Sequence, residues 1–317
     1  MPDVLGITTP IFLLIGLGYA AVRWGLYART ALPALGSFVI SFCIPALLFK
    51  AINQRSLAEV ANPRYLLAYA GGSLAALAAG LLWAHWRRQP RDAAAMTAMG
   101  MACANTAFIG YPIALQVVGP EATVALAMTF LVENFLMIPL CLALADSASA
   151  GGQPLLPAFG RALLGLRRNP IVLGILAGLV ATLLGWQPPP PVQRAIDLLA
   201  MAASAAALFF IGGSLVGLQV RGLVGQVSAV AVGKLLLHPL AVLAAVWLVG
   251  GLTPALQWAA VVLAAAPMLG IYAIIGQRYG RQAVNAASML VATVASFGSL
   301  AAVLALLHAL WGAAPPH

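Results

Sequence analysis

The sequence predicts an all-α polytopic membrane protein of ten transmembrane helices, arranged as two inverted five-helix repeats. Hydrophobic residues make up 63% of the 317 positions and charged residues only 7%, whereas about a quarter of an ordinary soluble domain is charged. Apolar runs of about twenty residues recur along the chain, which is the length that a helix needs to cross the hydrocarbon layer. Two of these runs, in corresponding positions of the two halves, are interrupted by proline and glycine.

The ten segments follow from apolar runs between polar punctuation. They lie at residues 4–23, 31–52, 65–86, 94–118, 122–145, 169–186, 194–218, 227–250, 255–277 and 283–311. The longest polar interval, 146–168, separates five segments from five. We therefore expect a first repeat over residues 1–146, a cytoplasmic connecting loop over 147–168 and a second, inverted repeat over 169–317.

The basic residues predict how the chain is oriented. Eleven Lys and Arg residues lie in the odd-numbered connections and four in the even-numbered ones. Such a bias places the odd connections in the cytoplasm and both termini outside, in the periplasm. The net charge is +9, but the basic residues form no dense run. We therefore expect the protein to interact with the lipid bilayer and not with nucleic acid. Two lysines against fourteen arginines are typical of GC-rich bacterial coding, which favours a bacterial inner membrane.

Enzyme motifs are absent from the sequence. There is no H-E-x-x-H, G-x-S-x-G or Walker sequence. The three cysteines, Cys43, Cys103 and Cys141, lie inside apolar segments without metal-ligand spacing. We therefore expect no enzyme, no cofactor, no metal site and no direct use of ATP.

The interruptions of the fourth and ninth segments are the strongest candidates for a binding site. The fourth carries Asn105, Thr106, Gly110 and Pro112, and the ninth carries Pro267, Gly270 and Tyr272, at an offset of about 161 residues. Proline and glycine release backbone groups from the helix, and such groups persist in a membrane only against protein, water or solute. A single kink is more often a packing feature. A matched pair beside an Asn-Thr sequence favours a substrate site, as in transporters built from inverted repeats.

Several further pieces of sequence resemble one known family. They are Ile44–Phe49, Asn105-Thr106 followed by Gly110-Tyr111-Pro112, Asn169-Pro170-Ile171, Leu208–Leu215, Lys234–Pro239, and Pro267 with Gln277–Gly280. In this order, over nearly the whole chain, they resemble the auxin efflux carrier family, which includes plant PIN-type exporters and bacterial malonate and malate permeases. The resemblance implies a scaffold part and a transport part, with the fourth and ninth helices crossing beside the substrate.

The chain departs from that family's pattern at the crossing. Ala104 stands where the motif has proline before Asn105, and Met268 follows Pro267 where a polar residue is usual. The site is therefore expected to be less polar on one side than in the plant carriers, so auxin is not the expected substrate and the identity of the acid stays open.

Asn105 and Thr106 are the first candidates for substrate contact, because an amide and a hydroxyl can donate to a carboxylate. Freed backbone around Gly110, Pro112, Pro267, Gly270 and Tyr272 is a further candidate. The alternative is that the polar pair only satisfies carbonyl groups of the broken helix.

Four polar residues inside other segments are candidates for coupling or gating. Glu133 and Asn134 lie in the middle of the fifth segment, where a charged carboxylate is costly and must face protein or water. They could hold a coupling Na+ or relay H+, or Glu133 could be a neutral, hydrogen-bonded side chain. Lys234, one turn before His238, could bind an anion or brace its helix.

The sequence thus predicts a secondary transporter of a small organic anion, a mono- or dicarboxylate, working by alternating access. The alternatives are an anion channel and a non-transporting receptor or complex subunit. Two G-x-x-x-G patterns, starting at Gly174 and Gly213, permit close helix contacts either within the protomer or across a homodimer.

Overall fold

The computed structural model describes residues 2–54, 62–148, 154–217 and 224–314, and its regular structure within these ranges is helical apart from one isolated β-bridge. In the first half the helices are α1 (Pro2–Arg23), α2 (Leu32–Phe38), α3 (Ile44–Asn53), α5 (Pro63–Trp86), α6 (Arg91–Ala102), α7 (Tyr111–Val118), α8 (Glu121–Val132) and α9 (Ile138–Ala148). In the second half they are α10 (Leu155–Gly165), α11 (Pro170–Leu183), α12 (Pro190–Ser214), α13 (Val224–Val232), α14 (His238–Val249), α15 (Pro254–Ala265), α16 (Tyr272–Gln277) and α17 (Gln282–Trp311).

Short helical segments of other pitch, labelled η, join several of these helices. The π-helical turns are η2 (Val39–Cys43), η3 (Thr106–Gly110), η4 (Glu133–Met137) and η6 (Gly233–Leu237), and the 3-10 turns are η1 (Arg29–Ala31) and η5 (Leu166–Arg168). A π-turn inserts one extra residue into a helix and frequently marks a functional site. Two of them, η4 and η6, begin at or next to the buried charges Glu133 and Lys234.

Three helices begin with the same local chemistry. Asn62, Asn169 and Thr253 each precede a proline, and each side-chain oxygen accepts a hydrogen bond from a backbone N–H of the first turn. The cap satisfies a donor that the helix leaves free, and proline at the next position needs no acceptor. These caps fix the starts of α5, α11 and α15 close to the positions that the apolar runs predict.

Each of the ten apolar segments of the sequence is helical in the structure, whole or broken. Six helices of the described residues are long and apolar enough to cross a membrane: Arg29–Asn53, Pro63–Trp86, Glu121–Ala148, Pro190–Ser214, Gly225–Val249 and Gln282–Trp311. A seventh span results if the bent pair Leu155–Arg168 and Pro170–Leu183, at 69°, is taken as one. The chain is therefore an all-helical, multi-pass protein. The 147–168 connection, expected as a loop, contains α10, because its leucines and Phe159 give it an apolar helix face.

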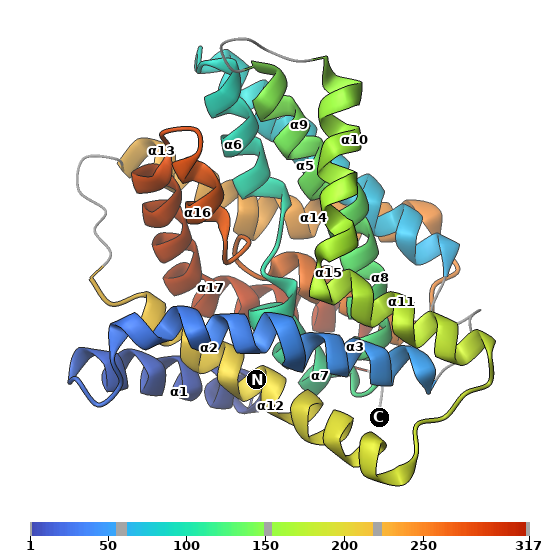
Figure 1. The fold of residues 1–317 in the computed structure, drawn as a ribbon. Coiled ribbons are helices and arrows are strands. Elements are labelled where there is room, and N and C mark those ends of the chain that lie inside the picture. The colour runs from blue at the N-terminus through green and yellow to red at the C-terminus, as the bar shows by residue number, and fades with distance from the viewer. Residues whose placement is uncertain (1, 55–61, 149–153, 218–223, 315–317) are drawn as a thin grey trace.

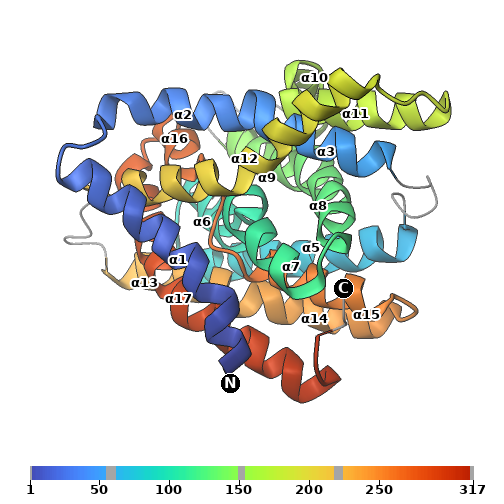
Figure 2. The same cartoon turned by 90° about the horizontal axis from the view of Figure 1, so that it is seen from below.

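The helices form two groups that draw on both halves of the chain. In the first, α1 packs along α12, and α3 packs against α11 and α12; they lie together along the lower side of Figure 1. In the second, α5 packs against α6 and α14, and α15 packs against α8, α7 and α14. Seen from below, α7 lies between α1 and α15 (Figure 2).

Small residues allow close contact inside the first group. A Cβ on Gly174 of α11 would lie 2.7 Å from the Cα of Pro45, and one on Gly178 would lie 3.0 Å from the Cβ of Ile52. A side chain at Gly213 of α12 would likewise meet Leu32 at 2.7 Å. The two G-x-x-x-G patterns therefore serve contacts within one protomer at Gly174, Gly178 and Gly213.

The two interrupted segments meet at the centre of the second group. The chain is extended between α6 and η3 and again between α15 and α16, and Ala104 pairs with Met268 in an antiparallel bridge. The N–H of Asn105 donates to the carbonyl of Pro267 at 2.7 Å, and the N–H of Leu269 donates to the carbonyl of Cys103 at 3.3 Å. Backbone groups that the broken helices release thus satisfy one another across the crossing.

Candidate functional site

A cavity of about 490 Å³ lies beside this crossing. Its wall is mostly apolar. It comes from α2 and η2, from the extended stretch after α6 together with η3, from the α8–η4–α9 segment, from the α10–α11 connection, from α12, and from the stretch that leads into α16. The polar residues of the wall are Ser37, Asn105, Thr106, Glu133, Asn134, Arg168 and Asn169. An apolar cavity of this size with a few convergent polar groups is the usual form of a small-molecule site.

Asn105 lies on the wall of this cavity. The residue is 4% exposed, yet its side-chain amide caps no helix and forms no hydrogen bond with any residue that the structure describes. Its own carbonyl accepts from the N–H groups of Ile109 and Gly110, so the backbone is fixed. The helical run Thr106–Val118 starts here, and the first N–H groups of a helix have no intrahelical acceptor. The amide and this helix start together offer donors to an anion.

Thr106 lines the same cavity but its hydroxyl has another partner. The hydroxyl donates to Oε2 of Glu133 at 3.0 Å, and the residue is 1% exposed. Toward the cavity this oxygen can therefore only accept. The sequence predicted a hydroxyl donor toward the substrate at this position, but the hydroxyl donates its hydrogen bond to Glu133 instead.

The remaining crossing residues divide into one that lines the cavity and four that do not. Gly270 lies in the wall, and a Cβ on it would come to 3.5 Å from Nδ2 of Asn105. Outside the wall, Pro267 accepts the Asn105 N–H, and the hydroxyl of Tyr272 donates to the carbonyl of Met96 at 2.8 Å. Gly110 and Pro112 are buried in the packing of η3 and α7. These four support the shape of the crossing.

Glu133 connects the cavity to the first broken helix. Its Oε1 accepts from the N–H of Ala104 at 3.1 Å and from the hydroxyl of Tyr69 at 3.4 Å. Together with the Thr106 bond, both carboxylate oxygens are occupied in a residue that is 2% exposed. Glu133 thus holds the extended stretch of the chain just before η3.

Asn134 joins the fifth segment to the start of α11. Its Nδ2 donates to the carbonyl of Phe130 at 3.0 Å, and its Oδ1 accepts from Nδ2 of Asn169 at 3.4 Å. Asn169 caps α11 by accepting from the N–H of Ile171 at 2.9 Å. The pair therefore spans from the second helix group to the first across the cavity.

Lys234 and His238 lie outside the cavity wall. Both are 0% exposed. Nζ of Lys234 donates to the carbonyl of Ala264, at the end of α15, at 2.6 Å and lies 2.8 Å from Nδ1 of His238. Nε2 of His238 lies 2.9 Å from Oγ of Ser73. A cation at a helix C-terminus is favourable, so Lys234 braces the second broken helix.

Three polar residues of the wall were not among the sequence candidates. Ser37 gave no signal, since serine is common in apolar helices. Asn169 was noted only as a family match, and Arg168 only as one of the cytoplasmic charges. A cation directly before an Asn-Pro helix start was the available signal, because a helix start next to a break can face a cavity.

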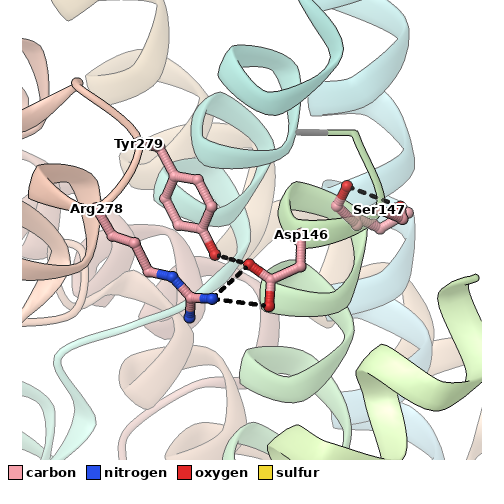
Figure 3. Close-up of polar contacts among 5 residues, drawn as sticks. Asp146, Ser147, Arg278 and Tyr279 are labelled. Atoms are coloured by element: carbon pink, nitrogen blue, oxygen red, sulfur yellow. Dashed lines mark hydrogen bonds and ion pairs between the residues drawn. The ribbon is translucent and has the colours of Figure 1, made fainter. Parts of the chain in front are cut away.

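A second polar cluster ties α9 to the turn between α16 and α17 (Figure 3). The hydroxyl of Tyr279 donates to Oδ1 of Asp146 at 2.6 Å, and the guanidinium of Arg278 lies 3.2 Å from the same oxygen. Burial, and then the bond to Asp146 and its negative charge, raise the pKa of the Tyr279 hydroxyl above its usual value. This cluster connects the two halves of the chain, and none of its three residues is part of the cavity wall.

Among the residues that the structure describes, no group of three or more His, Cys, Asp or Glu side chains is placed to hold a metal ion. An apolar, multi-helix chain with a cavity that carries a few polar groups at the meeting point of two broken helices has the form of a membrane transporter.

Comparison with known proteins agrees with this class. The chain belongs to the family described as "Membrane transport protein", which matches residues 4–154 and 158–304, and the resemblance to the auxin efflux carriers is thereby confirmed. A protein of Rhizobium meliloti (strain 1021), named "Putative malonate transporter", is 32% identical over 326 residues, which cover 99% of this chain and 98% of that relative. The chain is thus a multi-pass membrane transporter and not an enzyme.

Proposed function

We propose that the protein is a secondary transporter that moves a small organic anion, a mono- or dicarboxylate, by alternating access at the helix crossing. The observation that carries the proposal is Asn105, an almost fully buried amide without a partner in the described structure, on the wall of a cavity of about 490 Å³. The amide lines the cavity, where a substrate oxygen could accept its hydrogen bond.

The chemistry of the crossing favours an anion. The Asn105 amide donates, and the start of the helical run Thr106–Val118 adds a partial positive charge and free N–H groups. The name of the relative from Rhizobium meliloti supports a carboxylate in particular. The apolar wall around Phe108, Phe130 and Phe210 suits a short carbon chain.

The two helix groups supply the moving parts of this mechanism. The first group, with α1, α3, α11 and α12, would be the scaffold, and the second would carry the crossing to one side of the membrane and then the other. The proposed topology has ten crossings of a bacterial inner membrane in two inverted repeats, with both termini in the periplasm. A homodimer through the scaffold is part of the proposal.

Energy would come from the membrane potential or a cation gradient. A negative interior expels anions at about 2.3 kcal/mol per charge per 100 mV. Glu133 is the proposed site for coupling to H+ or Na+, because its carboxylate lines the cavity and also bonds to Ala104 of the crossing. Protonation would weaken the hydrogen bonds that it accepts and so couple charge to the shape of the site.

Counterflow in proteoliposomes tests the proposal. Purified protein is reconstituted into proteoliposomes that are loaded with unlabelled malonate, malate, lactate or indole-3-acetate. Uptake of the same acid in labelled form is then followed. We expect counterflow of at least one short acid, and a loss of about tenfold or more in Asn105→Ala. Gly270→Ala, which places a methyl group beside the Asn105 amide, should reduce uptake as well.

The matched control is Asn53→Ala. Asn53 is a buried asparagine, 6% exposed, that donates to the carbonyl of Trp186 and is not part of the cavity wall. Uptake should survive in this variant. Downhill flux without counterflow would indicate a channel, and no flux of any acid would favour a receptor or complex subunit.

A further inference from the structure

The cavity wall contains two residues with a formal charge, Glu133 and Arg168. Glu133 is 2% exposed and accepts hydrogen bonds on both oxygens. Arg168 is exposed, and its side chain has no hydrogen bond or ion pair within the described ranges of the chain. The free charge of the site is therefore positive, and it belongs to a residue that the proposed mechanism does not use.

The position of Arg168 is set by the geometry of the α10–α11 connection. It is the last residue of η5 and directly precedes Asn169, the cap of α11. The axes before and after this point differ by 69°, and Arg168 is on the cavity wall while Arg167, one position earlier in the same turn, is not. The Asn169 side chain bonds to both Ile171 and Asn134, which fixes the backbone to which Arg168 is attached.

A guanidinium at this place has a specific chemical consequence. It stays charged at any physiological pH and presents donors in a planar fork that fits a carboxylate. Asn105 and the helix start at Thr106 offer donors for one carboxylate on the crossing side of the cavity. A second carboxylate on the same molecule would otherwise lie in a largely apolar wall, where an unpaired anion is costly.

We propose that Arg168 receives the second carboxylate of a short dicarboxylate whose first carboxylate lies at Asn105, so that the substrate class is the dicarboxylates and Arg168 sets the preference over monocarboxylates. This rests on the proposed function. Asn105 belongs to the helix crossing and Arg168 to the start of α11 in the first helix group, so one dianion would connect the two groups. A monocarboxylate would reach only the crossing.

Arg168 could instead be one of the cytoplasmic charges that orient the chain or contact lipid phosphate. Arg167 separates these roles. Arg167 belongs to the same turn as Arg168 and is also exposed, but it lies outside the cavity wall. A role in topology or lipid contact would involve both arginines, whereas a role in substrate binding involves Arg168 alone.

The experiment measures competition for substrate in proteoliposomes of the full chain. Uptake of the best labelled acid is inhibited by malonate, malate, lactate and acetate in wild type, Arg168→Gln, Arg168→Lys and Arg167→Gln. We expect wild type to prefer dicarboxylates, and Arg168→Gln to weaken them by about tenfold or more while monocarboxylates change less than about threefold. Arg168→Lys should retain part of the preference, and Arg167→Gln all of it. Elution from size-exclusion chromatography and the thermal midpoint of each variant confirm folding.

Two results would overturn the inference while leaving the proposed function intact. One is uptake of carboxylates without a dicarboxylate preference in wild type. The other is an Arg168→Gln variant whose affinity for both classes is unchanged, or falls by the same factor. Absence of carboxylate uptake in wild type would overturn the proposed function and this inference together. An equal effect of Arg167→Gln would assign the arginines to topology or lipid.

Discussion

Glu133 and Lys234 bond to the backbones of the two different broken helices that meet at the crossing. The carboxylate of Glu133 accepts the N–H of Ala104 at 3.1 Å, and the ammonium of Lys234 donates to the carbonyl of Ala264 at 2.6 Å. Each charge thus satisfies a backbone group that the break leaves without a helical partner. Both residues are at most 2% exposed.

Truncation of Glu133 should destabilise the protein. In Glu133→Ala the N–H of Ala104 and the hydroxyls of Tyr69 and Thr106 lose their acceptor inside the membrane. Each buried donor left unsatisfied costs about 1–3 kcal/mol. The thermal midpoint in detergent should therefore fall clearly below that of Glu133→Gln, which keeps one acceptor oxygen. Equal midpoints for the two variants would show that these bonds contribute nothing to stability.

Glu133→Gln also tests the coupling role. The variant retains the shape of the side chain and removes its ability to gain or lose a proton. We expect the dependence of uptake on external pH or on Na+ to flatten, while substrate binding by the Asn105 amide persists. Uptake with unaltered rate and unaltered pH and cation dependence would assign Glu133 to structure alone.

Lys234 and Glu133 should be energetically coupled. Tyr69 donates to Oε1 of Glu133 and its ring packs edge-on against His238, which lies 2.8 Å from Nζ of Lys234, so one buried network connects the two residues. Lys234→Met leaves the carbonyl of Ala264 without its donor, and a buried polar group left unsatisfied costs about 1–3 kcal/mol. The double variant Glu133→Gln/Lys234→Met should lose less than the sum of the single losses, by about 1 kcal/mol or more. Unfolding in denaturant measures all three, and simple additivity would show that the two charges are independent.

The sequence predicted the helical segments well because apolar runs and polar connections dominate their boundaries. The cap at Asn169 and the end of α17 at Trp311 lie where hydropathy and N-cap chemistry place them. The matched interruptions predicted which helices break. Hydropathy alone could not predict α10, because a short amphipathic helix between two polar stretches is similar in composition to a connecting loop.

The side-chain partners were less accessible from the sequence. Glu133 and Thr106 are 27 positions apart, and Lys234 and Ala264 are 30 positions apart, so no local pattern predicts their bonds. Tyr272 was a substrate candidate because it follows the second break, but its hydroxyl bonds to Met96, a partner 176 positions away. Arg168 was counted as a topological charge because nothing local shows that the α10–α11 bend lies on the cavity wall.

Tyr279 should make stability fall at alkaline pH. Its pKa in the folded protein is raised by burial and by Asp146 above the ordinary value of 10, so the folded state holds the proton more tightly than the unfolded state. This contribution is complete below about pH 10 and is lost as the pH rises through the folded value. Tyr279→Phe lacks the titrating group, so its stability should decline less than that of wild type between about pH 9 and 11. Equal declines would show that the Tyr279–Asp146 bond does not persist in solution.

Arg278, the second residue that contacts Asp146, provides the matched control for the Tyr279 variant. Arg278 is 68% exposed, and its guanidinium lies 3.2 Å from Asp146. Exposed ion pairs contribute about 0–1 kcal/mol, so Arg278→Gln should change the free energy of unfolding at neutral pH by less than about 0.5 kcal/mol. Tyr279→Phe should cost about 1 kcal/mol under the same conditions. A larger loss for Arg278→Gln than for Tyr279→Phe would show that the ion pair with Asp146 stabilises the fold more than the Tyr279 hydrogen bond does.

Gly174 sets the distance between α11 and α3, and through it the position of the cavity wall. A methyl group there would lie 2.7 Å from the Cα and 2.8 Å from the carbonyl oxygen of Pro45, both backbone atoms that cannot move alone. Gly174→Ala should therefore destabilise the protein by about 1–3 kcal/mol. Gly71→Ala, in the interior of α5 with nothing within 4 Å of the added atom, should be neutral or slightly stabilising.

The same pair of variants extends the test to transport. Gly174 lies in α11, the helix whose start carries Asn169 and is preceded by Arg168. If the helix moves away from α3, its capped start moves with it, because the Asn169 side chain bonds to the N–H of Ile171. Gly174→Ala should then weaken dicarboxylate uptake beyond its loss of folded protein, whereas Gly71→Ala should leave uptake unchanged. Normal affinity per folded molecule in Gly174→Ala would show that the α11 start holds its place independently of this contact.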